Sequence, residues 1–126
     1  MNANAPHPAE PPRLDAAALA RLRELDPDGR HGVVLRVMGA FESSLLRMMA
    51  QLQAERADGN PGVVASVAHT LKSSSASVGA LELSRTCAGV ERRLRDGGAG
   101  DLVADIERLL AAGEDALAAV ATMLRP

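Results

Sequence analysis

Residues 61–79 have the sequence PGVVASVAHTLKSSSASVG, which contains the clearest helix signals in the chain. Pro61 follows Asn60, and this order is typical of a helix start, because asparagine caps the first turn and proline fits inside it. Gly79 is a typical helix stop. Between these points the apolar residues recur every three or four positions, as on the buried face of a helix, and they are Val64, Val67, Ala68, Leu71 and Val78. The stretch predicts an amphipathic helix over residues 61–78.

Three more long segments have the same apolar spacing, at about residues 31–57, 81–96 and 101–124, the last of them starting at the cap Asp101. Their apolar residues are Val34, Val37, Met38, Phe41, Leu45, Met48 and Leu52, then Leu83, Cys87, Val90 and Leu94, then Leu102, Ile106, Leu109, Leu117, Val120 and Leu124. Gly113 lies inside the last segment at a cost of about 1 kcal/mol, for which the sequence offers no reason.

The breaks between these segments complete the fold prediction. No proline lies between Gly62 and Arg125, and a short helix begins after Asp15 and ends before Asp26. Four amphipathic helices joined by short links can bury their apolar faces only against one another. The predicted fold is therefore all-α: an antiparallel four-helix bundle with a short additional N-terminal helix that caps one end.

Length and composition narrow the class of protein. The chain has 126 residues, enough for one compact domain. Four prolines fall within residues 1–12, so we expect a flexible Pro-rich tail there and the bundle domain over residues 13–126. A net charge of −2 and an aromatic content of 1% argue against nucleic-acid binding. No apolar run approaches the roughly 18 residues of a membrane span, and the start lacks a signal-peptide pattern, so we expect no membrane association and a cytoplasmic location.

His69 is the residue that points to chemistry. Helical geometry places it roughly 160° from Leu71, away from the core. Lys72, three residues on, lies on the same side and can put a cation beside the ring. The other residues expected on this face are all small, and they are Gly62, Ala65, Ser66, Ser73, Ala76 and Ala80. A face without long side chains favours close approach by another protein.

Residues 68–80, AHTLKSSSASVGA, resemble the signature of histidine-containing phosphotransfer (HPt) domains, in which His-x-Leu-Lys is followed by small residues and then Gly-Ala. The resemblance extends to the helical layout of residues 13–124. Ser73 is a departure, because many members have glycine there, and we expect it to alter access slightly. Glu91 corresponds to a position where some members have a glutamine near the imidazole. Arg95 corresponds to a basic residue that assists transfer.

The resemblance implies that His69 accepts a phosphoryl group from an aspartate of one receiver domain and passes it to an aspartate of another. A neutral imidazole has a free lone pair and needs no separate base for this attack. Lys72 would stabilise the phosphate charge, Glu91 would orient the ring and Arg95 would assist. An ordinary alternative for Glu91 is a surface ion pair with Arg95 at i+4 spacing.

The implied partners are receiver domains of response regulators and of hybrid histidine kinases, bound transiently through Ala65, Ser66, Ser73, Ala76 and Ala80. The chain has no phosphate-binding loop, so we expect a phosphocarrier without kinase or ATP-binding activity. We expect no cofactor bound by this chain, with Mg²⁺ on the partner receiver domain.

No metal site is expected, because His7, His31 and His69 lack the paired spacing of metal-binding helices. The polar helix faces favour a monomer. The competing interpretation is a non-catalytic scaffold or dimerisation bundle in which His69 is incidental.

Overall fold

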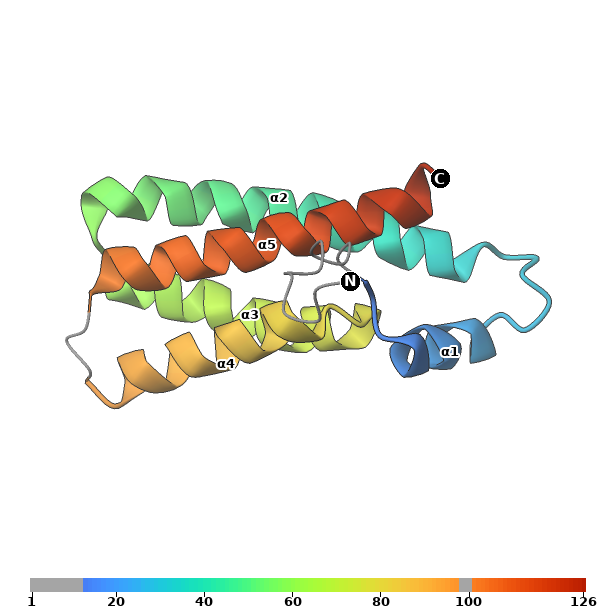
Figure 1. Ribbon diagram of the computed structural model, residues 1–126, viewed down its shortest axis with the longest axis horizontal. Helices are drawn as coiled ribbons and strands as arrows, with labels where there is room; N and C mark the ends of the chain where they lie inside the picture. The colour runs from blue at the N-terminus through green and yellow to red at the C-terminus, as the bar shows by residue number, and fades with distance from the viewer. Residues whose placement is uncertain (1–12, 98–100) are drawn as a thin grey trace, which may run out of the picture.

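The computed structural model describes residues 13–97 and 101–126. Its five helices are α1 (Ala16–Glu24), α2 (Val33–Asp58), α3 (Pro61–Val78), α4 (Leu81–Arg95) and α5 (Leu102–Leu124). Helices α2 to α5 lie side by side, each antiparallel to the next, and α1 lies at one end (Figure 1). No strand occurs in this part of the chain. The all-α bundle prediction is confirmed, whereas the tail predicted for residues 1–12 lies outside the described residues.

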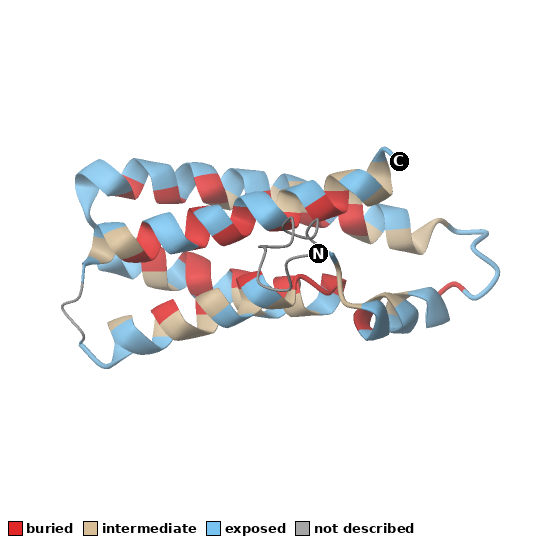
Figure 2. Ribbon diagram, viewed as in Figure 1, coloured by how far each residue is buried: buried red, intermediate tan, exposed pale blue. Residues whose placement is uncertain are grey.

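The core consists of the faces that α2 to α5 turn toward one another (Figure 2). All five apolar residues predicted to face inward from α3 are buried. On α2 the structure differs from the prediction in detail: Met49 is buried, whereas Val34, Val37 and Met48 are only partly buried and pack against the core. The reason is that α2 contacts both α3 and α5, so its buried arc is wider than one stripe.

Met49 also explains the glycine in α5. A Cβ atom added to Gly113 would lie 2.9 Å from the Met49 sulfur. This separation is shorter than a carbon–sulfur van der Waals contact, so the missing side chain makes room for Met49 between α2 and α5. Met49 therefore occupies space that a side chain at position 113 would share.

Three of the predicted helix starts have the expected caps. The side chain of Asp15 accepts a hydrogen bond from Ala18 N at 3.0 Å, that of Asn60 accepts from Gly62 N at 2.9 Å, and that of Asp101 accepts from Ala104 N at 3.2 Å. The predicted ends of α4 and α5 agree with the structure to within one residue.

The start of α2 differs from the prediction. The helix begins at Val33 rather than at residue 31, and its N-cap Gly32 has no side chain to offer. The buried carboxylate of Asp26 serves instead, because it accepts from His31 N at 3.1 Å and from Val33 N at 3.2 Å. This cap comes from a residue seven positions away, which local sequence rules do not detect.

Gly79 joins α1 to the bundle. It ends α3 with a φ of +86°, a left-handed conformation that favours glycine. Its carbonyl oxygen accepts a hydrogen bond from Asp15 N at 2.9 Å, and the neighbouring Ala18 of α1 is buried. The short helix is thereby held at the α3–α4 turn, as the capping prediction required (Figure 1).

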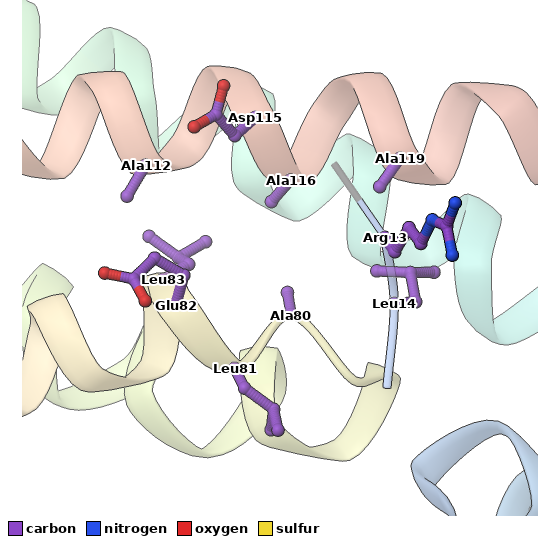
Figure 3. A pocket seen from close by; sticks show the side chains of 10 residues that line it. All are labelled: Arg13, Leu14, Ala80, Leu81, Glu82, Leu83, Ala112, Asp115, Ala116 and Ala119. Atoms are coloured by element: carbon purple, nitrogen blue, oxygen red, sulfur yellow. The ribbon is translucent and has the colours of Figure 1, made fainter. Parts of the chain in front are cut away.

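A hollow of about 350 Å³ lies between the start of α4 and the middle of α5. Figure 3 shows that its wall on α5 is formed largely by alanines, with charged side chains at the edge. The lining residues are Arg13, Leu14, Ala80, Leu81, Glu82, Leu83, Ala112, Asp115, Ala116 and Ala119. None of the residues predicted to act on a phosphoryl group lines this hollow.

Candidate functional site

His69 projects from α3 with 71% of its side chain exposed, on the side that faces away from the core. Its Nδ1 atom contacts Oε2 of Glu91, which comes from the neighbouring helix α4. The outward orientation follows from the helical period: Val67, Ala68 and Leu71 on either side of the histidine are buried, which leaves residue 69 on the opposite face. The predicted placement of His69 is confirmed.

Glu91 connects the histidine to the lysine. Its Oε1 atom accepts a hydrogen bond from Lys72 Nζ at 2.6 Å, while Oε2 contacts His69. Only 15% of the Glu91 side chain is exposed, against 37% for Lys72. The hydrogen bond from Lys72, followed by the one with His69, holds the pKa of the Glu91 carboxyl below its usual value. The carboxylate is therefore ionised at neutral pH and has both oxygens occupied.

The surface ion pair between Glu91 and Arg95 is not formed. Among the hydrogen bonds and ion pairs of the described residues, Glu91 contacts only His69 and Lys72, both on α3. The i+4 spacing correctly places Arg95 one turn along α4. The spacing along α4 does not show that α3 places Lys72 and His69 against the same carboxylate.

This contact determines which ring nitrogen can react. A carboxylate oxygen accepts hydrogen bonds, so the Nδ1 atom of His69 is the donor and carries the ring proton. In a neutral imidazole the other nitrogen, Nε2, then has the free lone pair. Since the ring is mostly exposed, the arrangement offers Nε2 as a nucleophile to a group on another molecule.

The small residues around His69 occupy the predicted face with one exception. Ser66 and Ser73 are exposed, as is Gly62, and Ala65 and Ala76 are partly buried. Ala80 is only 6% exposed and belongs to the core, so its predicted place on this face was wrong. Helix α3 ends at Val78, and the left-handed Gly79 redirects the chain, so a helical period counted from His69 no longer applies.

Arg95 is exposed at the C-terminal end of α4. Among the described residues it makes no ion pair and no side-chain hydrogen bond with His69 or Glu91. It lines a groove together with Glu91, so it lies beside the site without touching the imidazole.

A hydrogen bond joins α3 to α4 next to the site. Ser84 Oγ donates a hydrogen bond to the carbonyl oxygen of Lys72 at 2.8 Å. Sequence reasoning missed Ser84, because its partner lies on another helix and no motif marks it.

Beneath the site, Cys87 is fully buried, and its burial raises the pKa of the thiol to about 12. A thiol in this state is an inert core group, as predicted.

Two features do not occur within residues 13–97 and 101–126. No group of three or more His, Cys, Asp or Glu side chains is arranged to hold a metal ion. None of the helices there combines the length and the apolar character needed to span a membrane.

Fold and site together define a helical bundle that presents one supported histidine to other molecules. The sequence matches the family model of the Hpt domain over residues 36–123, more than half of the chain, so this protein belongs to the Hpt domain family. Its structure is similar to that of histidine-containing phosphotransfer protein B (HptB) from Pseudomonas aeruginosa PAO1, with a TM-score of 0.76 and 22% sequence identity. The match covers 92% of this chain and 97% of that one.

At 22% identity, this likeness shows the fold. A comparison with curated proteins found no match. Membership of the family assigns the chain to histidine phosphotransfer in two-component phosphorelays, in which Hpt domains are phosphocarriers that interact transiently with receiver domains. The non-catalytic scaffold is not favoured by this assignment.

Proposed function

We propose that His69 is the residue that carries the phosphoryl group, taking it from an aspartyl phosphate of one receiver domain and giving it to an aspartate of another. The observation that carries the proposal is the contact between Nδ1 of His69 and Glu91, which leaves Nε2 as the exposed nucleophile. No other described histidine has a side chain supported in this way, since His31 takes part only through its backbone nitrogen.

In the accepting step the Nε2 lone pair attacks phosphorus while the bond between phosphorus and the aspartyl oxygen breaks. The bonding pair leaves with the aspartate as a carboxylate, and the proton on Nδ1 stays on the ring. The ring gains positive charge as the new nitrogen–phosphorus bond forms. Donation to the second aspartate reverses these changes, so the protein returns to its starting state after each cycle.

Lys72 is the cation for the phosphoryl oxygens. It lies one helical turn from His69 on the same face and is bound to Glu91 in the resting state. Phosphoryl transfer depends on positioning and on neutralising charge on the equatorial oxygens, which a flexible ammonium group can do by turning from Glu91 toward them.

Glu91 is a positioning residue that acts through the imidazole. Its carboxylate keeps the proton on Nδ1, and its negative charge favours the positive ring of the phosphorylated state, as an aspartate does for the histidine of a hydrolase triad. A neutral amide at this position would hold the ring but supply no charge.

The remaining parts of the reaction come with the partner. Exposed Ser66 and Ser73 and partly buried Ala65 and Ala76 leave space for a receiver domain above His69. The receiver supplies Mg²⁺ and the acceptor carboxylate, and this chain binds no cofactor.

The partners are receiver domains of response regulators and of hybrid kinases. The chain itself acts as a cytoplasmic monomer and has no catalytic activity beyond carrying phosphate.

The test is transfer of radioactive phosphate from phosphorylated receiver domains. Wild-type protein and His31→Gln are expected to become labelled, with label that is lost in acid and kept in base, as for phosphohistidine. His69→Gln, a substitution at an exposed position, should take up no label while keeping its helical circular dichroism. Labelling of His69→Gln at the wild-type rate would reject this residue as the carrier.

Glu91→Gln and Glu91→Ala test the role of the carboxylate. We expect Glu91→Gln to keep the ring orientation and lose its electrostatic support, so it should transfer more slowly than wild type and faster than Glu91→Ala. Unchanged transfer in Glu91→Ala, together with an unchanged imidazole titration by NMR, would reject Glu91 as a positioning residue.

A further inference from the structure

A groove of about 340 Å³ lies beside His69, between the start of α3 and the end of α4. Ala65 in its wall precedes His69 by one helical turn, and Glu91 in its wall contacts the imidazole. The complete lining is Pro61, Gly62, Ala65, Glu91, Leu94 and Arg95. Any protein that covers His69 closely also reaches this groove.

The groove is hollow because of the residues that α3 places there. Pro61, Gly62 and Ala65 have no long side chains, and the partly buried Leu94 closes the space from the α4 side. The space is too small for a helix, whose diameter with side chains is about 10 Å, but it can hold one side chain.

Arg95 is the cationic side chain in the wall of the groove, and Glu91 is the anionic one. Among the described residues, Arg95 makes no ion pair and no side-chain hydrogen bond, whereas Arg93 and Arg108 both contact Asp105. The two Glu91 oxygens contact His69 and Lys72, and neither forms an ion pair with Arg95. The guanidinium group is therefore an unused donor at the edge of the site.

We propose that Arg95 and this groove receive an acidic side chain, aspartate or glutamate, from the receiver domain that docks on His69. The inference rests on the proposed function of His69. A carboxylate on a short stem fits the groove and offers the planar guanidinium two parallel hydrogen bonds. Lys72, which already shares Glu91 with the imidazole, acts on the phosphoryl group, and Arg95 acts on the partner.

This division makes Arg95 a specificity determinant. A receiver with a carboxylate opposite the groove gains an ion pair and a fixed orientation over His69. A receiver with a lysine or arginine there meets a like charge and docks poorly. Arg95 therefore assists transfer by selecting and orienting the partner.

The experiment compares two phosphate donors on the full chain. One is the phosphorylated receiver domain, taken from those encoded in the same genome, that gives wild type the highest kcat/KM. The other is phosphoramidate, a small donor that needs no docking surface. We expect Arg95→Glu to lower kcat/KM from the receiver by about tenfold or more. Labelling by phosphoramidate should fall much less than transfer from the receiver, because Glu91 and not Arg95 contacts His69 and Lys72.

Arg47→Glu is the matched control. Arg47 is exposed on α2, so its substitution changes the net charge equally without altering the groove. Transfer from the receiver to this variant should stay within about twofold of wild type. Arg95→Ala, whose loss should be smaller than that of Arg95→Glu, separates loss of an ion pair from charge repulsion.

The outcomes separate this inference from the proposed function. Equal losses with both donors would mean that Arg95 acts on the phosphoryl group, and undiminished transfer from the receiver would mean that it does nothing; either result overturns the inference. It is also overturned if no acidic-to-lysine substitution on the receiver restores transfer to Arg95→Glu. Failure of wild type to accept phosphate from either donor would instead overturn the role of His69.

Discussion

Replacing Gly79 by alanine is expected to destabilise the protein through two separable effects. The first is backbone strain, because a residue with a Cβ atom at a φ of +86° costs about 1–2 kcal/mol. The second is a collision: the new Cβ atom would lie 2.7 Å from the backbone nitrogen and 3.1 Å from the carbonyl oxygen of Asp15. Backbone atoms cannot rotate away as a side chain can, so α1 must move.

Moving α1 weakens the hydrogen bond from Asp15 N to Gly79 O, now 2.9 Å long. A lost backbone hydrogen bond and overpacking together cost about 1–3 kcal/mol. The free energy of unfolding of Gly79→Ala should therefore fall by about 2–5 kcal/mol in all. Urea unfolding followed by far-ultraviolet circular dichroism measures this quantity directly.

Gly59→Ala is the matched control, because Gly59 also ends a helix with a positive φ, +66°, but a Cβ atom there would meet no atom of residues 13–97 or 101–126 within 4 Å. It carries the strain without the collision and should cost only about 1–2 kcal/mol. The difference between the two variants isolates the contact with Asp15. Equal losses in Gly79→Ala and Gly59→Ala would refute the conclusion that close packing of α1 requires glycine at position 79.

Three further outcomes are expected. Ser75→Ala removes a fully buried hydroxyl that has no hydrogen-bond partner among the described residues and should raise the free energy of unfolding by about 1 kcal/mol in urea titrations; a decrease would show that the hydroxyl is satisfied. Cys87, with a buried thiol and a pKa of about 12, should react with Ellman's reagent only when urea unfolds the chain, and rapid reaction of the native protein would contradict its burial. The lowered pKa of Glu91 means that its carboxylate stabilises the folded state at neutral pH and loses this effect as pH falls through that pKa, so the stability difference between wild type and Glu91→Gln should shrink below about pH 4. A difference that stays constant with pH would argue against the ionic contact with Lys72.

Much of the fold could be predicted from the sequence because helices are encoded locally. The apolar spacing, the caps at Asp15, Asn60 and Asp101 and the stop at Gly79 depend on residues within a few positions of one another. The same helical period correctly predicted that His69 lies on the face of α3 that points away from the core.

Contacts between helices could not be predicted in the same way. Local spacing suggested that Glu91 pairs with Arg95, whereas the packing of α3 on α4 gives its carboxylate to His69 and Lys72. The close approach of α2 and α5 explains Gly113. These residues meet because rigid helices pack at particular distances and rotations, which no single segment contains. Local spacing is enough to place His69 on the outward face of α3, whereas the contact of its Nδ1 atom with Glu91 depends on how α3 packs against α4.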